Sequence, residues 1–241
     1  MANMEKKVVL VLVEGNTDET LLIGRLRELF KEKEIRFEPK NGDIFYDMEQ
    51  AKKPVKELIG NRVKEILLKR KFKPSNILAV LHILDTDGCF IESDAILVNN
   101  EQATLTEYQE NGIYVQTEAQ KHNIQQRNEV RSRNIQIMNT TQKILTYSYQ
   151  AYYFSRHLEH VVFNDMNPKK ENKVEKVDRF LDELEVPIEE FLEAFLPQER
   201  TATYEDTYKN SWQFVSQDLN SLKRATNIPL MLDFLQEQVP L

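Results

Sequence analysis

Six consecutive aliphatic residues, Val8 to Val13, constrain the fold more than any other stretch of the sequence. Runs of this kind are typical of strands that are buried on both faces of a parallel sheet. Glu14 and Gly15 follow directly and end the run. A second apolar run, Ile77 to Leu84, ends in the same way at Asp85-Thr86-Asp87-Gly88. The two runs therefore predict buried strands whose carboxyl ends carry acidic residues.

Two helical patterns and two further strands complete the order of the predicted core. Asp18 to Lys33 and Lys52 to Lys71 repeat apolar residues at helical spacing, which indicates helices packed on a sheet. Ile35 to Phe37 and Tyr149 to Phe154 have the composition of strands. A β-α-β-α-β order implies right-handed crossovers between parallel strands. We therefore expect an α/β fold with a mostly parallel, Rossmann-like sheet flanked by helices.

The rest of the chain predicts additions to this core. Thr117 to Leu145 has no glycine or proline and is rich in polar residues, so we expect it to be helical. A chain of 241 residues suits one domain with additions, or one large and one small domain. We predict an α/β domain over residues 1–165, with a helical insertion at about 91–147, and a helical C-terminal region over 166–241.

Composition sets the expected compartment. The single cysteine, Cys89, excludes an internal disulfide and fits a reducing environment. The early apolar run is far shorter than the roughly 20 residues of a membrane-spanning helix. It also ends in Glu14 rather than in a cleavage site, so it is a poor signal peptide. We expect a cytoplasmic protein with no membrane association.

Charge is unevenly distributed along the chain. The net charge of −7 argues against wholesale wrapping of nucleic acid, but it says little about a local groove. Basic residues gather between Arg62 and Lys73 and again between Gln120 and Lys143, whereas acidic residues dominate from Asp178 to Glu193. These stretches predict either a basic front and an acidic back or ordinary solvated helix faces.

The acidic residues at the two strand ends have the chemistry of a metal site. Phosphodiester hydrolysis uses a divalent ion to offset phosphate charge and to activate water, and Mg²⁺ (or Mn²⁺) prefers carboxylate oxygens. Asp85 and Asp87 flank one residue, so strand alternation predicts that both side chains lie on one face. Glu14 can act as a further ligand or as a general base, and Gly15 lets a phosphate approach the next helix N-terminus.

Each motif also has a purely structural interpretation. A glutamate after a strand is often only a helix cap, and Asp-X-Asp occurs in many turns. The combination of both motifs at the carboxyl ends of two buried strands favours a functional site, because sites in such sheets form beyond these ends.

Both motifs also resemble known signatures. Val11 to Glu19 resembles the first signature of Toprim domains, the module shared by topoisomerases, primases and several nucleases, and Ile83 to Asp87 resembles the second. The resemblance covers about Lys6 to Phe90, with a looser match to Phe163. It implies a metal-dependent nuclease in which Asp85 and Asp87 hold the ion.

Within Toprim proteins, the chain is most similar to nucleases of the overcoming-lysogenization-defect class and related anti-phage effectors. Asp18 and Glu19 match their acid-rich first motif, and Ser155 to Glu159 resembles a later element. The resemblance implies that Asp18 and Glu159 hold a second ion and that Arg156 faces the scissile phosphate. The alternative is that Ser155 caps a helix that carries an ordinary surface Arg156 and Glu159.

The same resemblance implies which partners the protein has. No phosphate-binding loop of the G-x-x-x-x-G-K-[ST] type is present, so we expect a separate ATPase as one protein partner, and a homo-oligomer as another arrangement. Nucleic acid, either DNA or RNA, is the expected substrate. The expected substrate clamp consists of Lys121, Arg127, Arg131 and Arg133.

Two other functions remain open. Ile83 to Gly88 also resembles the first motif of haloacid-dehalogenase-like phosphatases, in which Asp85 would be the nucleophile and Asp87 the general acid and base. That motif here follows the third predicted strand rather than the first, and it leaves Glu14 unexplained. The third hypothesis is a non-catalytic Toprim scaffold whose acidic residues bind metal or nucleotide and whose C-terminal helices bind a partner protein.

Overall fold

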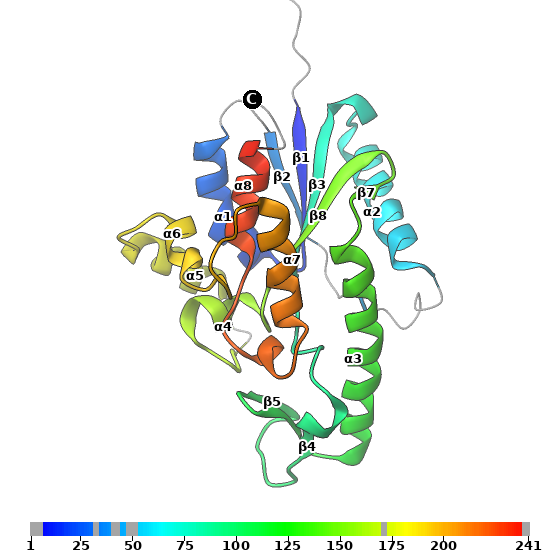
Figure 1. Cartoon of the computed structure of the whole chain (residues 1–241), viewed down its shortest axis with the longest axis vertical. Coiled ribbons are helices and arrows are strands. Elements are labelled where there is room, and N and C mark those ends of the chain that lie inside the picture. Colours follow the sequence, from blue (N-terminus) through cyan, green and yellow to red (C-terminus); the bar gives the residue numbers. More distant parts are fainter. Residues whose placement is uncertain (1–6, 31–33, 40–43, 47–52, 170–172, 238–241) are drawn as a thin grey trace, which may run out of the picture.

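A five-stranded sheet lies at the centre of the structure, a computed structural model that describes residues 7–30, 34–39, 44–46, 53–169 and 173–237 (Figure 1). The strand order is β2-β1-β3-β8-β7. The first four strands are parallel to their neighbours, and only β7 is antiparallel. This arrangement confirms the predicted α/β fold with a mostly parallel sheet. The strands are β1 (Val8–Val13), β2 (Glu34–Pro39), β3 (Ile77–Asp85), β7 (Lys143–Ile144) and β8 (Tyr147–Phe154).

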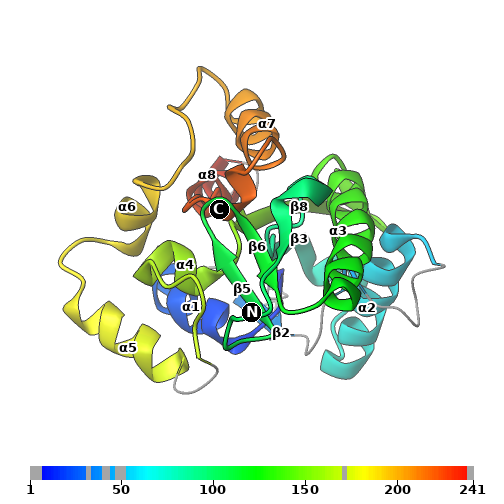
Figure 2. The same ribbon diagram turned by 90° about the horizontal axis from the view of Figure 1, so that it is seen from below.

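Helices cover both faces of the sheet (Figures 1 and 2). Helices α1 (Asn16–Leu29) and α8 (Ile228–Glu237) lie on one face, and α2 (Val55–Arg70) and α3 (Glu118–Asn139) lie on the other. Among the described helices, none is both long enough and apolar enough to cross a membrane. The remaining helices lie on the α1 side: α4 (Leu158–Phe163), α5 (Lys173–Glu183), α6 (Ile188–Glu193) and α7 (Tyr204–Val215).

The core explains why the aliphatic runs form strands. Every residue of β1 is buried, because helices cover both faces of the sheet. The same hydrophobic core continues into the C-terminal helices through Val177, Leu192, Trp212 and Leu235. The C-terminal region therefore shares one core with the α/β domain.

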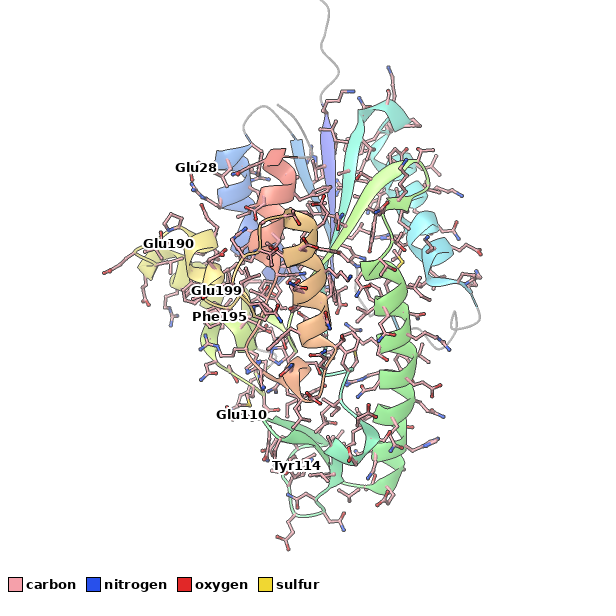
Figure 3. All side chains as sticks on the ribbon, in the orientation of Figure 1. Glu28, Glu110, Tyr114, Glu190, Phe195 and Glu199 are labelled. Atoms are coloured by element: carbon pink, nitrogen blue, oxygen red, sulfur yellow. The ribbon has the colours of Figure 1, made fainter. Side chains whose placement is uncertain are left out.

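The insertion holds a small sheet as well as the predicted helix. Strands β4 (Ile96–Val98), β6 (Gly112–Val115) and β5 (Thr106–Gln109) form a separate three-stranded sheet in the order β4-β6-β5. The sequence predicted only helix here, because strands of three or four residues, one of them polar, show no clear alternation. The small sheet extends beyond the carboxyl end of the central sheet, with Glu110 and Tyr114 at its outer part (Figure 3). Three short 3₁₀ turns are η1 (Pro74–Asn76), η2 (Ser93–Ala95) and η3 (Asn220–Leu222).

Side chains close the outer edge of β8. Strand β7 covers only the beginning of β8, which leaves later backbone groups without a neighbouring strand. The Asn227 side chain accepts a 2.8 Å hydrogen bond from the Tyr153 amide, and Thr226 donates a 2.6 Å bond to the Tyr153 carbonyl. The Tyr208 hydroxyl donates a 2.8 Å bond to the Ala151 carbonyl. The C-terminal segment thus satisfies an edge that would otherwise be open to pairing with another strand.

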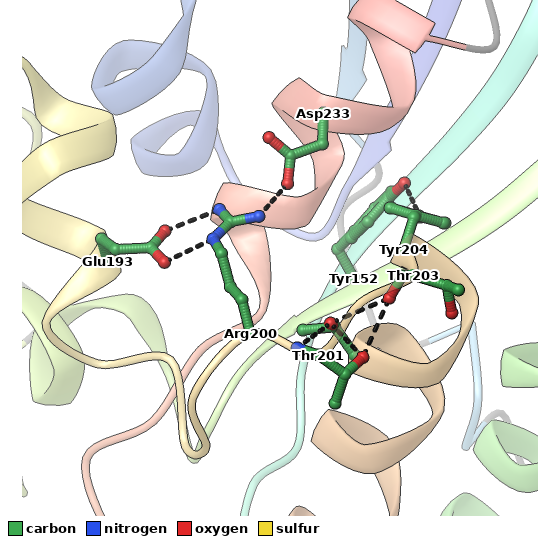
Figure 4. Close-up of polar contacts among 8 residues, drawn as sticks. Tyr152, Glu193, Arg200, Thr201, Thr203, Tyr204 and Asp233 are labelled. Carbon is green, nitrogen blue, oxygen red and sulfur yellow. Dashed lines mark hydrogen bonds and ion pairs between the residues drawn. The ribbon is translucent and has the colours of Figure 1, made fainter.

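One arginine ties the C-terminal helices together (Figure 4). The Arg200 guanidinium donates to both carboxylate oxygens of Glu193, at 2.6 and 2.7 Å, and also to the Asp233 carboxylate. Nearby, the Tyr152 and Tyr204 hydroxyls lie 2.9 Å apart, which joins β8 to α7. Arg200 thus joins α6 to α8, and the tyrosine pair joins α7 to the sheet.

Candidate functional site

Acidic side chains gather at the carboxyl edge of the central sheet. Strands β1 and β3 are parallel neighbours, so Glu14, which follows β1, and Asp85, which ends β3, lie at the same edge. Asp18 from the first turn of α1 and Glu159 from α4 join them in one surface pocket of about 330 Å³. The structure therefore brings together four of the five predicted metal ligands. The rest of the lining is Gly15, Asn16, Thr17, Leu158, Lys173 and Val174.

Asp87 lies beside this pocket rather than among its lining residues. Strand β3 ends at Asp85, and Asp87 has a left-handed backbone with a φ of 50°. Strand alternation therefore does not set the direction of the Asp87 side chain, contrary to the sequence-based expectation. Its Oδ2 lies 3.6 Å from Nη2 of Arg131, an ion pair on the α3 side of the edge.

Arg131 is buried within the acidic edge and does not form a surface clamp. Its side chain is 0% exposed, and its Nη2 donates a 2.8 Å hydrogen bond to Oε1 of Glu14. The same nitrogen donates to the main-chain carbonyl of Asp85. Arg131 was predicted to bind nucleic acid; this prediction is corrected because α3 lies along the sheet and turns that side chain inward.

The other predicted clamp residues do not share one surface. Arg127 lies one helical turn before Arg131, and its guanidinium donates to the Asp87 carbonyl at 2.9 Å and to the Tyr108 hydroxyl at 3.0 Å. It is therefore engaged within the protein. Arg133 is exposed, and Lys121 is half-buried. Arg127 is half-buried as well, so only Arg133 of the four is fully exposed.

One amide at the N-terminus of α1, that of Gly15, is bound by the first turn of the same helix. The Gly15 amide donates a 3.3 Å hydrogen bond to Oδ2 of Asp18, as in a capping box. The predicted phosphate contact through Gly15 is therefore not available in this arrangement, because the N–H group is already bound.

Burial changes the protonation of the acidic residues. Burial raises the pKa of Glu14 to about 7, against the opposing effect of Arg131. Burial also raises the pKa of Asp18 to about 7, and the charge of Glu159 adds to this effect. The pKa of Asp85 lies well above its usual value because of burial and the neighbouring charges of Asp18 and Glu14. A cation beside these carboxyl groups would lower their pKa values, because it favours the ionised forms.

Glu159 differs from the other carboxylates because it has two basic partners. Lys173 Nζ lies 2.7 Å from its Oε1, and His157 Nδ1 lies 3.3 Å from its Oε2. Burial alone raises the pKa of Glu159, but the hydrogen bonds from His157 and Lys173 outweigh it and lower the pKa to about 2. Glu159 is therefore ionised at neutral pH. Lys173 could not be predicted as a site residue, since it stands in a charged stretch without a motif.

Arg156 does not line the acidic pocket. It is fully buried, has a φ of 61°, and its guanidinium lies 4.6 Å from the centre of the Tyr108 ring. It donates to the main-chain carbonyl of Met166. The predicted contact with a scissile phosphate is corrected, because Tyr108 covers the guanidinium. The residue at the N-cap position of α4 is His157, and not Ser155.

The pocket supplies oxygen ligands but no ready-made metal cage. Within the part of the chain that the structure describes, no group of three Asp, Glu, His or Cys side chains converges closely enough to hold an ion. Oδ1 of Asp85 is buried and has no hydrogen-bond partner among the described residues. A buried carboxylate oxygen without a partner fits a cation, and carboxylates are the ligands that Mg²⁺ and Mn²⁺ prefer. The pocket thus offers oxygen atoms of the kind that a divalent ion prefers, although three of these side chains do not converge on one point among the described residues.

The basic stretch from Arg62 to Lys73 lies away from this site. It occupies the C-terminal part of α2 and the following loop, at the edge where β3 begins (Figure 1). There Lys7, just before β1, donates a 3.0 Å hydrogen bond to the Ser75 carbonyl. The predicted basic front therefore does not face the acidic pocket.

Comparisons of the chain with protein-family models, curated proteins and solved structures found no match.

Proposed function

We propose that this protein is a metal-dependent nuclease that hydrolyses phosphodiester bonds of nucleic acid at the acidic pocket. One observation carries the proposal: the carboxylates of Glu14, Asp18, Asp85 and Glu159, which are far apart in the sequence, line the same pocket. Carboxylates that remain buried together repel one another, so such a cluster is costly without a cation. The site is therefore suited to a divalent ion and, through it, to a phosphate.

Each acidic residue has a role in this proposal. Asp85 would hold Mg²⁺ or Mn²⁺ together with Asp18 and Glu159, which line the same pocket. A bound ion would supply charge compensation for the phosphate and lower the pKa of an attacking water. The raised pKa of Glu14, about 7, suits a group that accepts and returns a proton at neutral pH. Lys173 fixes the orientation of Glu159 through their 2.7 Å contact.

The resemblance to anti-phage Toprim effectors extends the proposal beyond the chemistry. We infer an effector of antiviral defence that acts in the cytoplasm and works with a separate ATPase or with further copies of itself. DNA and RNA are both substrates to be tested.

The phosphatase hypothesis has less support from the geometry. It needs Asp85 as the nucleophile, and Asp85 lines the pocket, so the position of this residue alone does not separate the two hypotheses. The phosphatase hypothesis, however, assigns no role to Glu14, which lines the same pocket and pairs with Arg131. The nuclease hypothesis uses both residues.

The test compares cleavage by the wild type with three isosteric variants, Glu14→Gln, Asp85→Asn and Glu19→Gln. Glu19 is a matched control because it follows Asp18 directly but lines a different pocket, between α1 and α5. Single- and double-stranded DNA and RNA are incubated with Mg²⁺, with Mn²⁺ or with a chelator. We expect metal-dependent cutting by the wild type and Glu19→Gln, and none by the other two.

The alternatives predict different results in the same assay. Hydrolysis of a small phosphomonoester that requires Asp85 but not Glu14 would establish the phosphatase. A wild type that folds and hydrolyses neither substrate class would leave the scaffold, whether or not it binds metal.

A further inference from the structure

One nitrogen of Arg131 lies among oxygens of three acidic residues. Nη2 is 2.8 Å from Oε1 of Glu14 and 3.6 Å from Oδ2 of Asp87, and it donates to the main-chain carbonyl of Asp85. These oxygens come from the ends of two neighbouring strands, and the nitrogen comes from α3 on the covering layer. A positive centre surrounded by such oxygens occupies the kind of position that a metal ion takes.

The charge of this guanidinium is permanent. An arginine side chain remains protonated in proteins, and its planar fork keeps a fixed direction. Arg131 is 0% exposed, so water does not screen the charge that it places beside Glu14. A divalent ion bound to the same oxygens would stand next to a buried like charge, which is strongly unfavourable.

The opposite side of the acidic edge is free of this guanidinium. Asp18, Asp85 and Glu159 line the pocket, whereas Asp87 and Arg131 do not. Glu14 takes part in both groups, since it lines the pocket and also binds Arg131. The acidic edge is therefore divided into a part neutralised by a buried guanidinium and a part that faces the pocket. On the pocket side the partner of Glu159 is Lys173, whose side chain is 35% exposed and can move away.

We propose that Arg131 is a built-in cation that takes the place of a second metal ion, so that the protein binds a single divalent ion in the pocket lined by Asp18, Asp85 and Glu159. This inference rests on the proposed metal-dependent function and specifies its stoichiometry. It assigns Asp87 to the guanidinium rather than to the metal. Arg131 acts as a positioning residue, because it holds Glu14 and Asp87 and does not face the pocket.

Mn²⁺ binding to the metal-free full-length chain tests the proposal directly. Equilibrium dialysis and the electron paramagnetic resonance signal of free Mn²⁺ give the number of ions per chain without any substrate. We expect one ion for the wild type, one for Arg131→Lys and two for Arg131→Gln. Arg127→Gln is the matched control, one helical turn away, because Arg127 binds the Asp87 carbonyl and no carboxylate of the edge. It should also bind one ion.

Each departure from these numbers has a distinct meaning. Two ions in the wild type would overturn the inference and leave the proposed nuclease intact. A folded Arg131→Gln that binds one ion with wild-type affinity would also overturn it. No ion in the wild type would remove the metal-dependent function together with the inference. The wild-type count decides the question even where Arg131→Gln does not fold.

Discussion

The main-chain amide of Asp87 donates a 2.9 Å hydrogen bond to the carbonyl of Arg156, and both residues have left-handed backbones, with φ values of 50° and 61°. They follow the ends of the paired strands β3 and β8, where Asp85 is opposite Phe154. A left-handed conformation costs a non-glycine residue on the order of 1 kcal/mol. Such strain persists only where the surroundings impose it, and here it lies next to the acidic pocket. The two strand ends are thus held together in a conformation that local preference does not favour.

The charge of Asp87 should stabilise the fold through Arg131. Asparagine tolerates a left-handed backbone as aspartate does, so Asp87→Asn removes the charge and leaves the strain unchanged. We expect a loss of roughly 1 kcal/mol in the free energy of unfolding, because a buried guanidinium loses a counter-charge. Asp218→Asn is the control, since Asp218 is exposed and also left-handed, with a φ of 47°. Urea unfolding should show no change there, and equal losses in both variants would contradict the role assigned to Arg131.

The central sheet could be predicted because its signal is local. A continuous aliphatic run such as β1 needs burial on both faces, and a position inside a sheet covered by helices provides that burial. The small sheet of the insertion could not be predicted, since β5 is polar and half-buried and gains its partners only in the tertiary structure. The way in which the C-terminal helices join the core through Trp212 also depends on packing that no local pattern records.

Gly88 should be essential to the turn that follows Asp87. Its φ is +65°, and an added Cβ would lie 2.7 Å from a methyl carbon of Leu222. We therefore expect Gly88→Ala to cost about 2 kcal/mol or more, from backbone strain and overpacking together. Gly24→Ala provides the contrast, because Gly24 lies inside α1 with nothing within 4 Å of the added carbon. That variant should gain up to about 1 kcal/mol. Thermal and urea unfolding measure the stability of both variants. A Gly88→Ala variant as stable as the wild type would refute the steric argument.

The acidic residues of the candidate site could be predicted, whereas the contribution of α3 could not. Glu14 and Asp85 follow buried strands, so the sheet alone brings them to one edge. The inward direction of Arg131 was not predictable, because the buried face of α3 mixes polar and apolar residues and lacks a hydrophobic stripe. Those buried residues are Asn128, Arg131, Ile135 and Met138. In such a helix, tertiary contacts rather than a hydrophobic pattern determine which side chains face the sheet.

Closure of the β8 edge by Asn227 should be important for stability. Asn227 is fully buried and accepts from the buried Tyr153 amide at 2.8 Å. Asn227→Ala leaves that amide without a partner, and we expect a loss of about 2 kcal/mol. The control is Asn111→Ala, which removes only an exposed 3.0 Å bond to the Tyr114 hydroxyl and should cost about 0.5 kcal/mol or less. Similar losses for the two variants in urea unfolding would show that the edge does not depend on this contact.

Asp18 should make the metal-free protein less stable as the pH rises. Burial raises its pKa from 3.8 to about 7, so the folded state binds this proton more tightly than the unfolded state. The resulting stability is complete below the unfolded pKa and is lost as the pH rises through the folded pKa. Asp18→Asn removes this dependence, so we expect it to gain on the order of 2 kcal/mol relative to the wild type between pH 4 and pH 7.5. The measurement is urea unfolding at a series of pH values with a chelator present. Added Mn²⁺ should reduce the difference at pH 7.5, because a cation near the pocket stabilises the ionised carboxylate. Parallel stability curves for the two proteins would mean that Asp18 titrates normally in the folded state.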